Sequence, residues 1–140
     1  DGNVTLKKDR DYTVSYSANK GIGTAKVTVT GKGSYTGKIT KTFKINPQGQ
    51  SISAKGDKSG KKIAVTLAKH SSNSGYQVSY ADNSGFKNSK SLWLSGNSKN
   101  KGTIKGLKSK KTYYVKARDY KTIGKTKVYG KWSAVKKVSI

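Results

Sequence analysis

The sequence predicts an all-β protein built from two tandem β-sandwich modules. Only 31% of its 140 residues are apolar, so each module has a thin core of the kind that two facing sheets provide. Apolar residues alternate with polar ones along several segments, as they do in half-buried antiparallel strands. Sixteen glycines supply turns, and no stretch holds a helical period long enough to predict a helix.

The first module is expected to contain three strands. Tyr12, Val14 and Tyr16 sit two apart with Thr and Ser between them, and the two segments that follow alternate in the same way. The predicted strands cover residues 12–16, 25–30 and 39–45. The segment Asn46–Gln50 has the composition of a linker. We therefore expect a first module at residues 1–46, a linker at 47–50 and a second module at 51–140.

Seven short strands are expected in the second module. Turn signals rich in Gly, Ser, Asn and Asp separate them at short intervals. Seven strands in about 90 residues are typical of a sandwich. The predicted strands cover residues 51–54, 62–68, 75–80, 91–95, 102–104, 112–120 and 134–140.

The stretch from Leu107 to Val115 carries a more specific pattern. A leucine is followed six residues later by Tyr113, which opens a strand. This resembles the fibronectin type III family, in which that tyrosine forms a corner and bonds back to nearby backbone. Trp132 resembles the entry to the last strand of that family. The resemblance covers nearly all of residues 51–140 and implies structural roles for Leu107, Tyr113 and Trp132.

Two residues depart from the fibronectin type III pattern. Leu67 stands where the family usually has a core tryptophan, and Asp119 stands where a small apolar residue is common. An acid that faces a sandwich interior must be neutralised, paired or hydrogen-bonded. We expect a simple salt bridge for Asp119, near a strand end that water reaches. The alternative is an intramolecular isopeptide bond between a lysine and an Asn or Asp.

The first module resembles part of the immunoglobulin-like repeats of Gram-positive surface proteins. The matching segments are 11–16, 23–37 and 42–45. A preceding strand of such repeats is not obvious here, so either the module is truncated or it leaves an exposed edge. The expected architecture is a partial immunoglobulin-like module followed by a seven-stranded fibronectin type III domain. The arrangement resembles stalk regions of clostridial-type secreted proteins, which implies an extracellular, secreted or cell-wall-associated location.

The sequence offers no catalytic or metal-binding constellation. The single histidine, His70, lies in a polar turn among serines and is interpreted as a solvated loop residue. A zinc site needs more His or Cys than the chain contains, and the chain has no Cys. Asp9–Asp11 and Asp82 are interpreted as turn residues because neither supplies the spaced ligands of a calcium loop. We therefore predict no enzyme activity, no cofactor and no metal.

Charge is the strongest compositional signal. Thirty Lys and Arg face six acidic residues, all Asp, for a formal net charge of +24. Arg10 and Arg118 are the only arginines, so diffuse lysine attraction to polyanions is favoured over sequence-specific reading of nucleic acid. The expected partners are anionic polymers: teichoic acid, sulfated glycan or non-specific nucleic acid. The candidate binding lysines are Lys61, Lys62, Lys110, Lys111, Lys136 and Lys137.

Trp93 is the remaining candidate for binding. It lies between Leu92 and Leu94, so it faces away from them and is exposed if the leucines are buried. With lysines nearby, an exposed tryptophan could stack on a sugar or a base. The structural alternative is packing against lysine stems or the other module.

These features predict a non-catalytic spacer or adhesion module of a secreted or cell-surface bacterial protein. The neighbouring domains of the parent protein would be further partners. The alternative is a dedicated polyanion-binding or carbohydrate-binding module appended to an extracellular enzyme. No apolar run reaches membrane-spanning length, so we expect no membrane insertion.

Overall fold

The chain folds into two compact all-β units. The computed structural model describes residues 3–140, which form eleven strands and no helix, so the predicted all-β class is confirmed. The units are Asp1–Ile45 and Asn46–Ile140, and each is described separately below. Within the described residues there is no helix long and apolar enough to cross a membrane.

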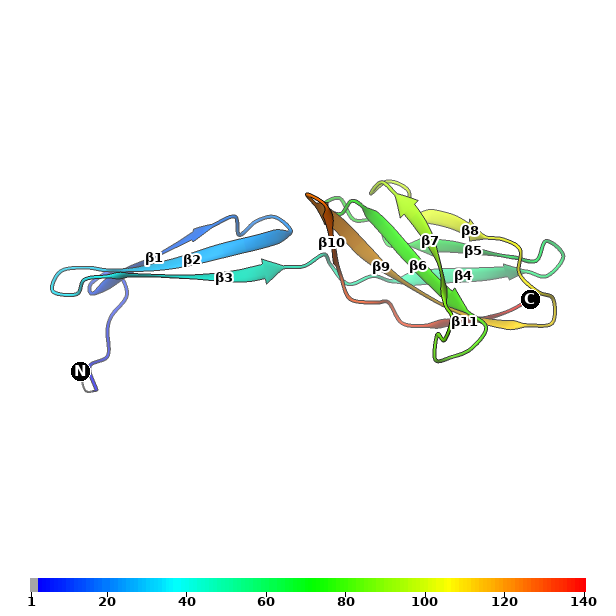
Figure 1. The fold of residues 1–140 in the computed structure, drawn as a ribbon, viewed down its shortest axis with the longest axis horizontal. Coiled ribbons are helices and arrows are strands. Elements are labelled where there is room, and N and C mark those ends of the chain that lie inside the picture. The colour runs from blue at the N-terminus through cyan, green and yellow to red at the C-terminus, as the bar shows by residue number, and fades with distance from the viewer. Residues whose placement is uncertain (1–2) are drawn as a thin grey trace. The chain divides into compact units, whose positions relative to one another are not determined.

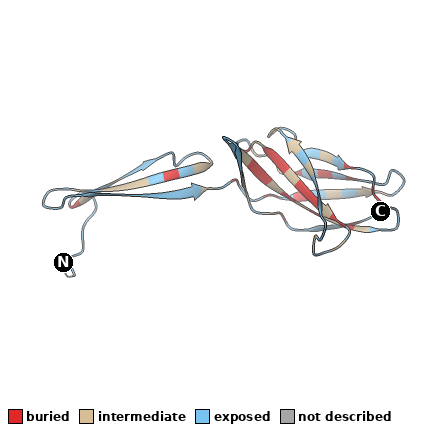
Figure 2. Cartoon of the chain, in the orientation of Figure 1, coloured by how far each residue is buried: buried red, intermediate tan, exposed pale blue. Residues whose placement is uncertain are grey.

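The first unit is one antiparallel sheet of three strands (Figure 1). The pairing places Val14, Val29 and Ile39 side by side on one face, while Thr and Lys side chains occupy the other. Over residues 3–45, Ala25 is the one buried hydrophobic residue, visible as the single red band on the middle strand in Figure 2. The described part is therefore a single sheet and not a two-sheet sandwich. Its strands are β1 (Tyr12–Ser17), β2 (Gly23–Gly31) and β3 (Lys38–Ile45).

The second unit is a sandwich of two antiparallel sheets (Figure 1). One sheet has the order β4-β5-β8, and the other has the order β10-β9-β6-β7, with β11 also paired to β9. The first sheet contains β4 (Ile52–Asp57), β5 (Lys62–Leu67) and β8 (Lys101–Ile104). The second contains β6 (Gly75–Ala81), β7 (Lys90–Ser95), β9 (Thr112–Ile123), β10 (Thr126–Tyr129) and β11 (Lys136–Ser139).

The core of the second unit lies between these sheets. Alternate residues of β5 and β9 are buried, as the red bands in Figure 2 show. Because side chains of a strand alternate between its faces, each strand gives one side to the core. Leu67, which stands where the fibronectin type III family usually has a core tryptophan, is among the buried residues. The core residues are Ile52, Ile63, Val65, Leu67, Tyr76, Val78, Ile104, Leu107, Tyr113, Val115, Ala117, Val138 and Ile140.

A tyrosine corner closes one end of the core. Leu107 and Tyr113 are both buried, and the Lys108 backbone N–H donates a hydrogen bond of 2.9 Å to Tyr113 Oη. The Tyr113 ring thus fills apolar space in the core. Its hydroxyl oxygen accepts a hydrogen bond from a backbone N–H that lies outside the β-strands.

One strand was missed at the end of the chain. The predicted turn at 122–124 belongs to a hairpin in which β9 runs to Ile123 and returns as β10 after Gly124 and Lys125. The expected last strand, 134–140, shortens to β11. Between β10 and β11 the chain bulges but stays attached to β9, since Ser133 N donates to Ala117 O at 2.7 Å.

The segment predicted as a linker packs within the second unit. Pro47 and Gln50 are both buried. The backbone of Gly130 lies against the carbonyls of Pro47 and Gln48, so closely that a side chain at this glycine would collide with them. The division between the units falls between Ile45 and Asn46, ahead of the whole predicted linker at 47–50.

We expect Tyr113→Phe to lower the free energy of unfolding of the second unit by about 1 kcal/mol, because the Lys108 N–H loses its acceptor. Denaturant unfolding followed by tryptophan fluorescence measures this, since both tryptophans lie in that unit. Tyr114→Phe is the matched control, because Tyr114 lies on the opposite face of β9 and should change stability little. Equal effects of the two variants would contradict the corner assignment.

Candidate functional site

Aromatic and cationic side chains gather on the outer face of the sheet β10-β9-β6-β7. Along β9 the odd-numbered residues from Tyr113 to Asp119 are buried, so Lys116, Arg118 and Tyr120 point to the other face. The pairing of β10 with β9 sets Tyr129 opposite Tyr120. Residues far apart in the sequence therefore meet on one surface, which we call the outer sheet face.

Part of this face is a stacked ladder of rings and cations. Lys116 Nζ lies 4.0 Å from the ring centroid of Phe86 and 4.8 Å from that of Trp132. The Arg118 guanidinium lies 4.3 Å from the Trp132 ring centroid and 3.6 Å from that of Tyr129. Each cation thus interacts with two aromatic faces, an attractive arrangement that also covers the rings. Trp132, predicted as a structural residue, contacts both cations of this ladder.

Arg118 is held in place by more than stacking. Its Nε donates a hydrogen bond of 2.8 Å to Gln77 Oε1 on β6. Burial lowers the pKa of its guanidinium. Because its faces contact two rings and its edge bonds Gln77, Arg118 is engaged within the protein and is not presented to a partner.

A shallow depression of about 320 Å³ opens beside this ladder, lined by Trp93, Ser95, Tyr120, Thr122 and Lys127. The Trp93 and Tyr120 rings meet edge to face, with centroids 5.4 Å apart and planes at 75°. Tyr120 is buried, whereas Trp93 is 42% exposed. Lys127 Nζ lies 5.7 Å from the Trp93 ring centroid. The depression thus combines an accessible indole face with an ammonium group.

A glycine makes room for the floor of this depression. Gly75 on β6 lies opposite Tyr120 in the pairing of β6 with β9, and the φ of Gly75 is +155°. A Cβ at this position would lie 2.8 Å from Tyr120 Oη. Only glycine accommodates both this φ and the overlying phenol.

The six candidate lysines do not form one cluster with Trp93. Lys61 and Lys62 belong to the turn and start of β5 in the other sheet, where Lys62 pairs with Asp57. Lys137 lies opposite Tyr114 on β11. Lys110 and Lys111 directly precede β9 and line a different depression together with Lys58. Lys136 lies on β11, opposite Val115 of β9.

The acidic side chains are largely occupied. Within residues 3–140 the ion pairs are Arg10–Asp11, Lys62–Asp57 and Lys111–Asp82, and the Asp119 carboxylate lies against the His70 ring. Hydrogen bonds from Gly60 N and Ser59 Oγ, with Lys62 nearby, lower the pKa of Asp57 to about 2. The Arg10 side chain lowers the pKa of Asp11 in the same direction. Most lysines of the described chain therefore have no carboxylate partner.

The prediction of a solvated loop histidine is wrong. His70 Nδ1 lies 2.6 Å from Asp119 Oδ2, and the two side chains are 17% and 1% exposed. Asp119 is thus deeply buried, and not at a strand end that water reaches. Its other carboxylate oxygen accepts a hydrogen bond of 2.6 Å from Gln50 Nε2. Sequence spacing could not reveal this, because the three residues come from three distant segments.

This buried network ties three segments together at one end of the sandwich. Gln50 Nε2 also donates to Ala68 O, and Gln50 Oε1 accepts from Ala68 N. The backbone N–H of His70 donates to Tyr76 Oη, which itself donates to Asn97 O at 2.6 Å. Buried polar groups that are satisfied in this way rigidify a core end and fix loop positions.

The His70–Asp119 pair is not completed into a nucleophilic site among the described residues. A triad of the Ser–His–Asp type needs a serine, threonine or cysteine bonded to the other ring nitrogen of the histidine. In residues 3–140 the hydrogen bonds of His70 go to Asp119 and Tyr76 alone. Over the same range, no three His, Cys, Asp or Glu side chains come together as metal ligands.

Sequence reasoning found Trp93 but missed its surroundings. Phe86, Tyr120, Lys127 and Tyr129 were not singled out, and Arg118 was noted only as one of the two arginines. A usable signal existed in Thr126–Tyr129, a β-favouring segment directly after Gly124 and Lys125. Recognising it as a strand would have brought the hairpin onto the outer sheet face.

Comparison with known proteins identifies the fold of the chain but does not assign the chain to a family. No family model matches the chain, and no curated protein matches it. Among solved structures it is similar to the FN1–FN3 domains of chicken CNTN1, with a TM-score of 0.57 and 18% sequence identity. That similarity covers 86% of this chain and 43% of the chicken chain, so the protein spans less than half of its neighbour. It shows that the chain has a fibronectin type III-like fold.

We expect His70→Ala to lower the free energy of unfolding by about 1–3 kcal/mol, because Asp119 Oδ2 stays buried without its partner. Denaturant unfolding of the full chain measures this. Lys69→Ala, at the exposed neighbouring position, should stay within about 0.5 kcal/mol of the parent. A His70→Ala protein as stable as the control would show that the pair contributes nothing.

Acid should destabilise the second unit in part through Asp57. Its pKa falls from 3.8 to about 2 on folding, so its contribution is complete above pH 3.8 and disappears as the pH falls through about 2. We expect the thermal midpoint, followed by tryptophan fluorescence, to drop between these two pH values. Asp57→Asn should show a smaller drop, since Asn does not titrate. An identical drop in both proteins would contradict this account.

Proposed function

We propose that the chain is a non-catalytic spacer and adhesion module of a secreted or cell-surface bacterial protein. Its lysine-rich surface associates with anionic polymers such as teichoic acid, sulfated glycan or nucleic acid. The two compact units follow one another along the chain, which suits a segment that separates or presents neighbouring domains of a longer protein.

The observation that carries this proposal is an uncompensated positive charge. The formal net charge is +24, and within residues 3–140 Arg10, Lys62 and Lys111 are the Lys and Arg side chains in ion pairs. A charge of this size on 140 residues far exceeds what solubility requires. Its field attracts polyanions over distances set by the ionic strength.

The nature of the cations favours diffuse attraction. Lysine is a compact, hydrated charge on a flexible stem, whereas bidentate recognition of phosphate or guanine relies on arginine. Arg118 is engaged in the ladder, and Arg10 bonds Asp11 through two nitrogens. Arg118 is therefore not presented to a nucleic acid, and one edge of the Arg10 guanidinium already bonds a carboxylate. The surface therefore suits polymers recognised by charge density.

The second candidate function is a dedicated carbohydrate-binding or polyanion-binding module appended to an extracellular enzyme. The accessible indole of Trp93 beside Lys127 favours it, because this pairing offers a defined contact in addition to diffuse charge. The two functions differ in how affinity responds to salt.

The test is a titration of the full chain with heparin, wall teichoic acid and duplex DNA over a series of NaCl concentrations. Diffuse lysine attraction predicts binding of all three at low salt, with log K falling linearly against log salt and no dependence on DNA sequence. Binding of one polymer that persists above about 0.3 M salt, where screening is short-ranged, would favour the dedicated module.

Two double variants serve as matched probes. Lys110→Gln with Lys111→Gln, and Lys136→Gln with Lys137→Gln, each remove two charges from different places. A diffuse field predicts similar, small reductions of affinity and of salt dependence for both variants. No binding of any of the three polymers at about 0.05 M salt, or equal binding of neutral dextran, would refute the proposed function.

A further inference from the structure

We propose that the depression lined by Trp93, Tyr120 and Lys127 is a subsite for one acidic sugar residue of the bound polymer. The ligand is a pyranose that carries a carboxylate or sulfate group. This inference rests on the proposed function and names the contact at which a sulfated or uronic-acid polysaccharide gains more than diffuse attraction.

The aromatic part of the subsite is an indole held in a fixed orientation. Trp93 projects from the outer side of β7 because Leu92 and Leu94 pack toward the core. The buried Tyr120 ring meets the Trp93 ring edge to face, with the two centroids 5.4 Å apart. Trp93 is nevertheless 42% exposed, so part of its apolar ring is accessible to solvent. The C–H face of a pyranose ring is the surface that stacks on such a plane without losing its hydroxyl hydration.

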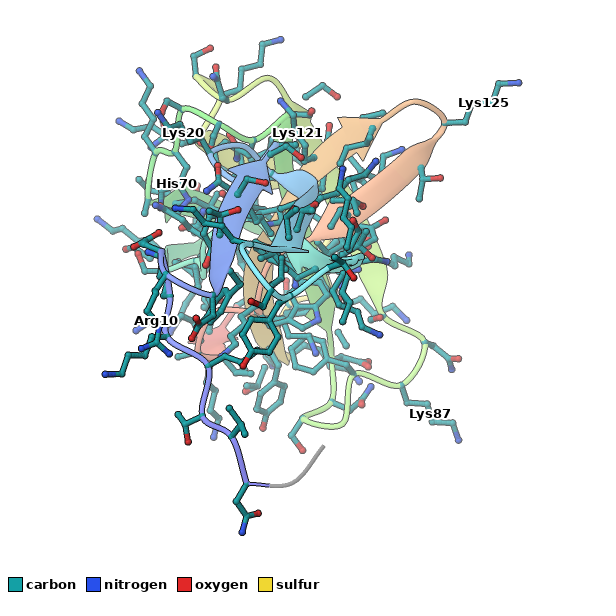
Figure 3. The ribbon with its side chains drawn as sticks, turned by 90° about the vertical axis from the view of Figure 1, so that its left-hand side faces the viewer. Arg10, Lys20, His70, Lys87, Lys121 and Lys125 are labelled. Atoms are coloured by element: carbon teal, nitrogen blue, oxygen red, sulfur yellow. The ribbon has the colours of Figure 1, made fainter. Side chains whose placement is uncertain are left out.

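The cationic part comes from the β9–β10 hairpin. Lys127 Nζ lies 5.7 and 5.8 Å from the Trp93 and Tyr120 ring centroids, and it has no acidic partner within residues 3–140. Lys121 and Lys125 are carried by the same hairpin, and Figure 3 shows Lys125 projecting from its tip. An anionic substituent beside the stacked ring would therefore find an ammonium group at the edge of the depression.

Hydroxyl groups complete the lining. Ser95 and Thr122 are both exposed and border the same depression as Trp93 and Lys127. Hydroxyls donate and accept hydrogen bonds, as sugar hydroxyls do. The volume of about 320 Å³ lies at the small end of ligand sites, which suits a single sugar unit of a longer chain.

The arrangement favours a sugar over a nucleobase. Proteins that bind single-stranded nucleic acid stack successive bases on several aromatic side chains along a groove. Here Trp132 is covered by Lys116 and Arg118, and Tyr129 also lies under the Arg118 guanidinium. Trp93 is the tryptophan that remains accessible. A single platform with one adjacent ammonium matches one charged sugar.

The experiment compares heparin with inorganic polyphosphate, a polyanion that has no sugar ring, using the full chain at about 0.15 M salt. Trp93→Ala should weaken heparin binding about tenfold and leave polyphosphate binding within about twofold, because stacking is lost while the net charge is unchanged. Trp93→Phe keeps a smaller platform and should retain part of the heparin affinity. It also serves as the test protein if Trp93→Ala does not fold, as judged by thermal unfolding.

Lys127→Ala and Lys87→Ala form a charge-matched pair, since each removes one exposed ammonium. Lys87, labelled in Figure 3, lies in the loop between β6 and β7 and is not among the residues that line the depression. The subsite predicts a several-fold larger loss of heparin affinity for Lys127→Ala than for Lys87→Ala. A diffuse field alone predicts equal losses.

The outcomes separate the two proposals. Heparin and polyphosphate binding that Trp93→Ala leaves unchanged, or weakens equally, overturns the subsite while the proposed polyanion association stands. A tenfold loss for oligothymidylate equal to that for heparin identifies base stacking and also overturns the sugar assignment. Failure of the parent protein to bind heparin at about 0.15 M salt overturns the subsite, whereas the proposed function is overturned only if heparin, teichoic acid and DNA all fail to bind at about 0.05 M salt.

Discussion

The register of β9 is the constraint on which the second unit depends. Tyr113, Val115 and Asp119 face the core, whereas Lys116 and Arg118 face outward. Because the side-chain period of a strand is two, a shift by one residue would bury the cations and expose the core. The bonds from Asp119 to His70 and Gln50 form only in the observed register. One buried carboxylate thus helps to fix both the interior and the composition of the outer sheet face.

The distribution of charge in the described part of the protein is equally uneven, because most carboxylates are paired whereas most lysines are not. Of the five Asp side chains in residues 3–140, four are engaged in turns, ion pairs or the buried network, so the lysines set the external field. The Lys116 ammonium and the Arg118 guanidinium lie over aromatic rings on the outer sheet face, so these cations contribute to packing as well as to charge. Trp93 differs because its ring stays accessible. A chain with a thin core can therefore be stable and still present a strongly basic surface.

The two units rely on different sources of stability. The second has a two-sheet core that includes Tyr76, Val78 and Val115, each with no exposed surface. The first is a single sheet with one apolar face, on which Tyr16 and Ile39 are 60% and 63% exposed. Burial of apolar area is the main favourable term in folding, so the described first unit gains little from it. This contrast follows from the number of strands available to cover each face.

The sequence by itself determined the all-β class, most strand positions and the outward direction of Trp93, because period-two alternation and turn residues act over a few neighbouring positions. It also determined the charge and the scarcity of arginine. Tertiary structure alone decided that His70 meets Asp119 and Gln50, since these residues are brought together by pairing between distant strands. It also decided that Lys127 and Tyr120 surround Trp93, because the unrecognised β10 completes that face. Local periodicity fixes which side of a strand a residue occupies, whereas the neighbours on that side depend on sheet order.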